Sequence, residues 1–134
     1  MDMNQKIYSV IGAAMAVHSE LKSGLLEPVY QDALSIEFSL RNIPFQKEYL
    51  QNVYYKGNKL DKFYKFDFLC FDDLIVELKA TETLLPEHRF QLFNYMRLSK
   101  INFGILINFG ENSLKSEPYF WDEQTNRCHL LKQS

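Results

Sequence analysis

Glu77 and Lys79 lie within an otherwise apolar stretch, Leu74–Ala80, and this arrangement restricts what the chain can fold into. Successive side chains of a β-strand point to opposite faces of the sheet. These two charged residues are two positions apart and therefore share a face, while Val76 and Leu78 occupy the other. Charged groups inside an apolar strand cost free energy unless they are paired or bound to an ion. The stretch therefore predicts a buried strand with an ion pair or a functional site on one face.

The hydrophobic spacing around this strand predicts a fold that mixes helices and strands. Apolar residues recur at helical spacing before Asn42, and the period changes to two from Phe45 onward. Gly24 follows the first helix, whereas Pro28 and Pro86 each open a helix. We expect helices at about 3–22, 28–41 and 86–99, and strands at about 45–55, 63–71, 74–80, 102–109, 114–121 and 127–132. This order (α-α-β-β-β-α-β plus a C-terminal hairpin) predicts an α/β fold, a mixed sheet flanked by helices.

The second predicted helix has an apolar stripe that should face the sheet. Its members are spaced by three or four residues, which places them on one side of a helix. The polar residues Gln31, Asp32, Ser35 and Ser39 lie mostly away from this side. We therefore expect the helix to pack through Val29, Ala33, Ile36 and Leu40.

The composition fits a single domain over residues 1–134, in which 46% apolar residues can form a core. The net charge of −2 and the isoelectric point near 5.9 argue against a protein that coats nucleic acid by bulk charge. A local basic surface is compatible with this balance. Four lysines flank the first predicted hairpin and are either a solvated charge run or contacts to a phosphate backbone: Lys56, Lys59, Lys62 and Lys65.

The two cysteines, Cys70 and Cys128, are far apart and form no CxxC pair, which excludes a zinc ribbon. Two cysteines do not provide the disulfide framework of a small secreted protein, so a reducing compartment, the cytoplasm, is the simpler interpretation. No stretch approaches the roughly 20 apolar residues of a membrane-spanning helix, so no membrane partner is expected.

Asp67 on the preceding strand is the residue that Glu77 and Lys79 could meet. If the two strands pair through a turn at residues 72–73, Asp67 lies across from the region of Glu77. The tightest turn places Asp67 opposite Leu78, on the wrong face of the sheet. A bulge or a one-residue shift in register would bring all three charged residues to one face. The sequence leaves the register open.

Asp67, Glu77 and Lys79 together have the chemistry of a metal-dependent phosphodiesterase. Carboxylate oxygens are hard ligands that suit Mg²⁺ or Mn²⁺. Such an ion can activate water and stabilise charge on a phosphate, and a neighbouring lysine can orient the water or hold a phosphate oxygen. An isolated E-x-K segment in a strand is more often a structural ion pair at a sheet edge, which is the competing interpretation.

Five parts of the sequence carry a resemblance to a known family: Asp67 with Glu77–Lys79, the segment Gly24–Tyr30, the segment Ile75–Ala80, Gln91 with Tyr95, and Leu106–Gly110. The first resembles the core motif of the PD-(D/E)XK nuclease superfamily. Taken together, in their order and spacing, they resemble the GxxExxY protein family, a branch of that superfamily, over nearly the whole chain. Phe66 stands where the motif has proline, at a position that is not a metal ligand in the superfamily.

The resemblance implies a restriction-endonuclease-like fold and a role for each matching residue. Asp67 and Glu77 would be the principal metal ligands, the carbonyl of Leu78 a further ligand, and Lys79 the catalytic lysine. Glu27 would be an additional carboxylate near the metal. Without the resemblance, Glu27 is a helix-entry carboxylate that interacts favourably with the helix dipole.

Four more residues are candidates for the site. Gln91 and Tyr95 are four residues apart on one helix, so both can point at the site, or they edge a packed face. Tyr30 is expected to be a core aromatic residue with its hydroxyl near the site. His18 borders the apolar stripe of the first helix, where most histidines are packed or on the surface, and the resemblance gives it a site role.

The sequence thus predicts a Mg²⁺- or Mn²⁺-dependent nuclease that hydrolyses phosphodiester bonds of DNA, with RNA as a further substrate class. The intact set of Asp67, Glu77 and Lys79 favours this function. The alternative is a non-catalytic nucleic-acid- or protein-binding module that retains the nuclease fold. The acidic isoelectric point favours the alternative, or a protein partner or homodimer that supplies substrate contacts.

Overall fold

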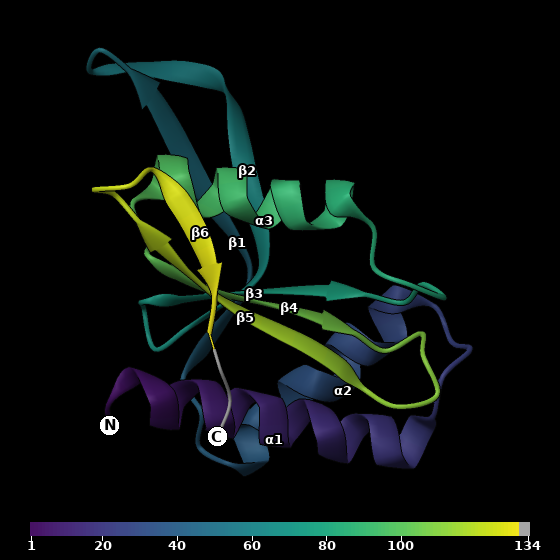
Figure 1. The fold of residues 1–134 in the computed structure, drawn as a ribbon. Coiled ribbons are helices and arrows are strands. Elements are labelled where there is room, and N and C mark those ends of the chain that lie inside the picture. The colour runs from purple at the N-terminus through teal and green to yellow at the C-terminus, as the bar shows by residue number, and fades with distance from the viewer. Residues whose placement is uncertain (132–134) are drawn as a thin grey trace.

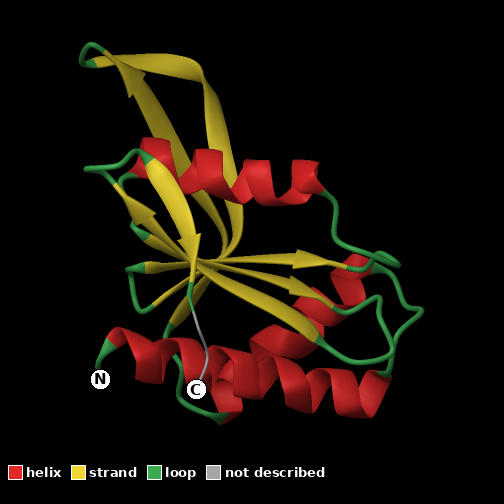
Figure 2. Cartoon of the chain, viewed as in Figure 1, coloured by secondary structure: helices red, strands yellow, loops and turns green. Residues whose placement is uncertain are grey.

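The computed structural model describes residues 1–131 and has the predicted order of elements (Figure 1, Figure 2). Its helices are α1 (Met3–Leu21), α2 (Glu27–Leu40) and α3 (Pro86–Ser99), and its strands are β1 (Phe45–Tyr55), β2 (Asn58–Cys70), β3 (Leu74–Lys79), β4 (Phe103–Asn108), β5 (Lys115–Asp122) and β6 (Arg127–Leu130). The α/β class and the C-terminal hairpin are confirmed, and Lys132, the predicted end of that hairpin, lies outside the described residues. None of the helices in residues 1–131 has the length and hydrophobicity needed to cross a membrane.

The strands form one six-stranded sheet in the order β1-β2-β3-β4-β5-β6. Within residues 1–131, β3 and β4 run parallel and the other neighbouring strands run antiparallel. A parallel pair needs a crossover connection, which α3 provides. Figure 1 shows α1 and α2 on one face of the sheet and α3 on the other. This mixed, helix-flanked sheet is consistent with the expected restriction-endonuclease-like fold.

A separate hydrophobic cluster covers each face of the sheet. On the face of α1 and α2, the cluster includes Phe68, Val76 and Leu78. On the face of α3, it includes Ile75 and Leu106. The alternation along β3 therefore places the charged residues of this strand on the face that α3 covers.

The packing of α2 corrects the prediction for this helix. Phe38 packs edge-on against Phe68 with ring centroids 5.1 Å apart, and Tyr30 stacks on Phe109 at 4.7 Å. These large rings bury more apolar surface than the aliphatic stripe would, so the helix turns its aromatic side to the sheet. The fully buried residues are Tyr30, Leu34 and Phe38. The predicted stripe was wrong, since three of its four members are exposed: Val29, Ile36 and Leu40.

The loop of residues 71–73 sets the register between β2 and β3. It joins the paired residues Cys70 and Leu74, so it is one residue longer than the tightest turn. Its first two residues have positive φ angles of 57° and 62°, which allow the chain to reverse within this loop. Continued along the two strands, this register brings Asp67 level with Glu77, although the pairing itself ends at Phe68 and Val76. Of the registers that the sequence left open, the structure uses the one-residue shift.

Residues 49–65 of β1 and β2, which we call the arm, extend as a hairpin past α3 (Figure 1). The arm begins its second strand at Asn58, earlier than the predicted Phe63, because Lys56 and Gly57 alone make the turn with positive φ angles. Tyr55 is 61% exposed, and the ammonium of Lys56 lies 5.4 Å from its ring centre. The lysines of the predicted charge run are all exposed: Lys56, Lys59, Lys62 and Lys65.

The segment after β4 fixes the end of β3. The buried side chain of Asn108 accepts hydrogen bonds from the N–H groups of Thr81 and Gly110, both at 3.0 Å, and donates to the carbonyl of Thr81 at 2.9 Å. The N–H of Phe109 donates to the carbonyl of Lys79 at 2.8 Å. A Cβ atom on Gly110 would come within 2.2 Å of the Thr81 carbonyl oxygen. These contacts hold the strand end that carries Lys79.

Gly110→Ala should therefore destabilise the protein by on the order of 2–4 kcal/mol, because the added methyl group meets backbone atoms that cannot rotate away. Urea unfolding measures this loss. Gly12→Ala in α1 is the matched control, since its Cβ would lie 3.4 Å from the end of the flexible Arg41 side chain. The control should be neutral or stabilising by up to about 1 kcal/mol through helix propensity. Equal stabilities of the two variants would contradict the close approach at Gly110.

Candidate active site

The pairing between β2 and β3 stops just before Asp67 and Glu77, and side chains provide the hydrogen bonds beyond that point. The last paired residues are Phe68 and Val76. The N–H of Leu78 donates to Oδ2 of Asp67 at 2.8 Å, and the N–H of Asp67 donates to Oε2 of Glu77 at 3.4 Å. The structure thus brings the two principal predicted ligands together, and each carboxylate is tied to the opposite strand.

A distortion of the neighbouring strand accompanies this break. The β1–β2 register continues on both sides of Glu48, which has a positive φ of 53° and lies across from Asp67. Phe66 and Phe68 are two residues apart, yet they belong to the clusters on opposite faces of the sheet. The alternation of side chains along β2 therefore shifts by one residue at Asp67. A strict period-two pattern cannot reveal such a shift.

Glu77 is a buried carboxylate without a full set of partners. It is 3% exposed, and its Oε1 atom has no hydrogen-bond partner among residues 1–131. Burial raises the pKa of Glu77 well above its usual value, and the side-chain hydrogen bond with Asp67 and the charge of Asp67 raise the pKa further. The charge of Lys79 and the hydrogen bond from the backbone N–H of Asp67 oppose this rise. A buried polar atom without a partner is costly, and native proteins keep few of them. This environment suits a group that binds a ligand.

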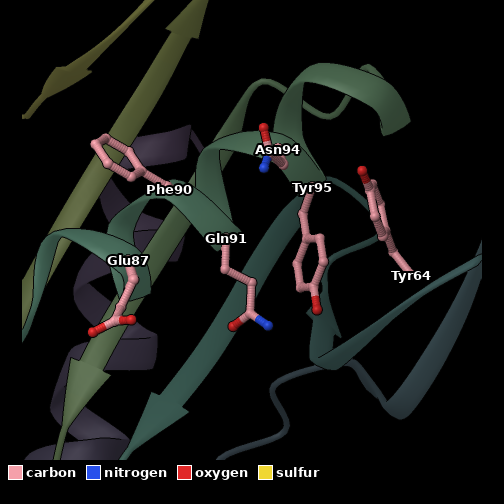
Figure 3. A pocket seen from close by; sticks show the side chains of 6 residues that line it. All are labelled: Tyr64, Glu87, Phe90, Gln91, Asn94 and Tyr95. Carbon is pink, nitrogen blue, oxygen red and sulfur yellow. The ribbon is translucent and has the colours of Figure 1, made fainter.

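Lys79 lies on the same strand face as Glu77 and reaches α3. Its Nζ atom donates to Oε1 of Gln91 at 3.2 Å. Figure 3 shows the side chains of Gln91 and Tyr95, one helical turn apart, directed to the same side of α3. Burial and the charges of Glu77 and Asp67 raise the pKa of Tyr95 to about 12, so its hydroxyl is a hydrogen-bond donor at neutral pH. The structure therefore brings Lys79, Gln91 and Tyr95 to the region of the paired carboxylates.

The loop before α2 is held by Tyr30 and leads directly into Glu27. Tyr30 is fully buried, and its hydroxyl donates to the carbonyl of Lys22 and accepts from the N–H of Leu25 at 3.1 Å. Gly24, between these two residues, has a φ of 104°, a conformation that favours glycine. Glu27 occupies the first turn of α2. The segment therefore acts as one unit that fixes the position of Glu27.

Glu27 belongs electrostatically to the same region. Burial raises the pKa of Glu27, the charge of Asp67 raises it further, and the charge of Lys79 opposes this. Gln31, one turn after Glu27, donates from Nε2 to the carbonyl oxygen of Asp67 at 3.3 Å. Within residues 1–131, however, no three His, Cys, Asp or Glu side chains are already grouped as a metal site. The structure pairs Asp67 with Glu77 and places Glu27 within electrostatic range as a third carboxylate.

His18 connects α1 with the segment after β4. It is buried, and its Nε2 atom is 2.9 Å from the carbonyl oxygen of Glu111. Its ring lies 6.3 Å from the ring of Phe109, on which Tyr30 stacks. These are the contacts of a packed histidine, and a role of His18 in the site stays a prediction.

Sequence reasoning missed two interactions that position the site. The sequence prediction places Gln31 among the outward-facing residues of the helix, although its spacing of four from Glu27 indicates a shared helix face. Arg89 of α3 pairs with Glu117 of β5 through two contacts, Nε–Oε1 at 2.7 Å and Nη2–Oε2 at 2.9 Å, and the hydroxyl of Tyr119 donates to Oε1 at 2.6 Å. This ion pair anchors α3 to the sheet. No spacing rule links a helix residue to a strand residue 28 positions away.

Residues 4–119 match the family model of the PD-(D/E)XK nuclease superfamily. The chain belongs to this superfamily. The matched range contains the paired carboxylates of Asp67 and Glu77, Lys79 beside them, and Glu27 at the start of α2. The PD-(D/E)XK superfamily is a superfamily of nucleases, and its members generally use divalent metal ions.

A known structure shows a similar fold at low sequence identity. The crystal structure of SSO0001 aligns with a TM-score of 0.55 at 19% identity, over 73% of this chain and 52% of that chain. This PD-(D/E)XK chain thus spans about half the length of that protein, and the likeness concerns the fold alone. No curated protein matches the sequence.

The donor atoms of this PD-(D/E)XK site fit a small divalent cation. Oε1 of Glu77 is buried without a partner within residues 1–131, and Asp67 provides an adjacent carboxylate. Both are hard oxygen donors of the kind that Mg²⁺ and Mn²⁺ prefer. The two carboxylates repel each other, and a cation would offset this repulsion. Asp67 and Glu77 would hold the ion, and Glu27 and the carbonyl of Leu78 stay predicted further ligands.

Glu77→Gln should raise the melting temperature of the metal-free protein, because it removes a buried carboxylate that interacts unfavourably with Asp67 and keeps the side-chain shape. It should also abolish the rise in melting temperature that Mg²⁺ or Mn²⁺ gives the wild type. Thermal unfolding with EDTA and with each ion measures both effects. Glu123→Gln, in an exposed turn, is the matched control and should change neither. A wild type that melts at one temperature with and without saturating metal would count against the site.

The Arg89–Glu117 pair predicts a pH dependence of stability. Hydrogen bonds from Arg89 hold the pKa of Glu117 below its usual value of 4.5, against the opposing effect of burial. The unfolded state then binds more protons, so the contribution of Glu117 to stability is complete above its unfolded pKa and is lost as the pH falls through the folded pKa. Glu117→Gln should be less stable than wild type at neutral pH, and this difference should shrink on acidification. Unfolding in urea across acidic pH tests this, and an unchanged difference would refute it.

Proposed function

We propose that this protein is a divalent-metal-dependent nuclease that hydrolyses phosphodiester bonds of DNA, with RNA as a further substrate class. One observation carries the proposal: the buried Oε1 atom of Glu77 lacks a partner within residues 1–131, although Asp67 and Lys79 are its neighbours. A purely structural ion pair would use the ammonium of Lys79 to satisfy this carboxylate. Instead, Lys79 donates to Gln91. The ion pairs within residues 1–131 do not include Lys79.

The proposed roles follow from these contacts. Asp67 and Glu77 hold the ion, and Glu27 supplies a third carboxylate near them. The chemistry that such an ion supplies when bound is polarisation of a phosphate oxygen and of a water molecule. Lys79 is no ligand in this scheme, so its ammonium can hold a phosphate oxygen or orient the attacking water. Gln91 steadies that ammonium through the 3.2 Å hydrogen bond.

We also propose that the chain belongs to the GxxExxY branch of the superfamily. The support is that each fixed residue of this motif has a distinct physical task here. Gly24 adopts a positive φ, Glu27 enters the first turn of α2 near Asp67, and the hydroxyl of Tyr30 bonds the loop that contains Gly24.

The partner and the compartment belong to the same proposal. The exposed lysines of the arm support nucleic acid, in the first place DNA, as the partner. The free thiols of Cys70 and Cys128 are compatible with a reducing cytoplasm. A protein partner or a second copy of the chain would add substrate contacts, and the exposed apolar residues of α2 offer a surface for it: Val29, Ile36 and Leu40.

Lys79→Met should leave a folded protein that still binds metal but has lost phosphodiester cleavage by at least about a hundredfold, because lysine acts on the phosphate or water and not on the ion. The measurements are cleavage of single- and double-stranded DNA and RNA, beside a calorimetric metal-binding isotherm. Arg127→Met is the matched control, since it removes one cation from an exposed end of β6. It should leave both properties unchanged.

Two results would contradict this scheme. If Lys79→Met loses metal binding as well as cleavage, the lysine is structural. A wild type that binds metal yet cleaves none of the four substrates would favour the non-catalytic binding module.

A further inference from the structure

An open pocket of about 420 Å³ lies beside the proposed site, between α3 and the arm (Figure 3). Gln91 belongs to both places, because its amide lines the pocket and accepts the hydrogen bond from Lys79. A group bound in this pocket would therefore be a close neighbour of a phosphate held by Lys79. The lining residues are Tyr64, Glu87, Phe90, Gln91, Asn94 and Tyr95.

The pocket presents aromatic surface that is supported from behind. The rings of Tyr64 and Tyr95 have centroids 4.6 Å apart, and Tyr95 packs on the buried ring of Phe66 at 5.3 Å. Phe90 is 61% exposed, although it is a large apolar side chain. A supported tyrosine pair and an exposed phenylalanine provide faces on which a flat ring can stack.

The polar groups of the pocket suit a neutral ring better than a phosphate. Asn94 is an exposed amide, so it offers a donor and an acceptor together. Glu87 brings negative charge to the lining, and these six residues, all within the described part of the chain, include no lysine or arginine. The lining itself therefore offers a phosphate no cation. A nucleobase is flat and uncharged, and its edges carry the donors and acceptors that an amide can pair with.

We propose that this pocket receives an unpaired nucleobase whose phosphate lies at Lys79, so that the substrate is a single-stranded or splayed nucleic acid. In a duplex, stacking and pairing keep the faces of each base away from Phe90 and Tyr64. Lys62 and Lys65 are exposed and lie on either side of Tyr64 in β2. They can contact the phosphate backbone of the nucleic acid whose base enters the pocket. The position of the phosphate rests on the proposed nuclease function, whereas binding of the base can be measured without cleavage.

The test compares wild type with Phe90→Ala and Asn94→Ala in EDTA, using fluorescence anisotropy. The probes are a labelled short oligothymidylate, a strand of equal length without bases, and a blunt duplex. Wild type should bind the oligothymidylate most tightly. Phe90→Ala should weaken that binding by about fivefold or more through lost stacking, and Asn94→Ala should weaken it less. Neither variant should change binding of the base-free strand, since its phosphates remain.

Leu98→Ala is the matched control, because Leu98 is 48% exposed on the same helix and lies outside the pocket lining. It should bind the oligothymidylate as wild type does. Equal affinity of wild type for the strands with and without bases would overturn the proposal that the pocket binds a base. An equal loss of affinity for the oligothymidylate in Phe90→Ala and Leu98→Ala would overturn it too.

A parallel cleavage assay with Mn²⁺ separates this inference from the proposed function. Base-dependent binding that Phe90→Ala weakens, in a protein that cleaves nothing, would uphold the pocket and refute the nuclease. Cleavage of the duplex at a rate that Phe90→Ala and Asn94→Ala leave unchanged would uphold the nuclease and overturn the pocket.

Discussion

The break in strand pairing between β2 and β3 at Asp67 and Glu77 is the constraint on which the site depends. A ladder that stops in a buried region leaves backbone N–H and carbonyl groups that need partners. The two carboxylates accept from the N–H groups across the break, and Gln31 donates to the carbonyl of Asp67. The carboxylate oxygens are the acceptors for these backbone N–H groups. The carboxylates therefore cannot rotate away from each other without leaving the N–H groups without hydrogen-bond partners. The repulsion between them is therefore built into the fold.

Contacts outside the carboxylates hold the elements that meet at this break. Asn108 joins β4 to the backbone after β3, and Tyr30 holds the loop that leads to Glu27. The Arg89–Glu117 pair ties α3 to β5 and so fixes the helix that faces Lys79. None of these contacts uses the carboxylates of Asp67 and Glu77, which repel each other. A site that concentrates negative charge can form only where such independent contacts stabilise its geometry.

The sequence predicted what depends on local periodicity and failed where long-range packing decides. The change of period predicted β1, and Pro86 predicted the start of α3. The face of α2 was predicted wrongly, because the helix carries two apolar stripes and the choice between them depends on the rings of the sheet that meet Phe38. The contact between Asp67 and Glu77 could not be derived either. It depends on a loop one residue longer than the tightest turn, in which Phe71, a residue with no special preference for positive φ, adopts a φ of 57°.

The distribution of charge reconciles an acidic chain with a nucleic-acid substrate. The arm has four lysines and one aspartate, a net charge of +3, so the other residues of a chain with net charge −2 carry −5. Attraction for a phosphate backbone is thus concentrated on the arm, and part of the opposing charge lies in Glu27, Asp67 and Glu77. The carboxylates repel a phosphate unless a cation offsets their charge. The acidic balance that favoured a non-catalytic module is therefore compatible with a nuclease, because a metal site of this kind requires acidic residues where the phosphate must bind.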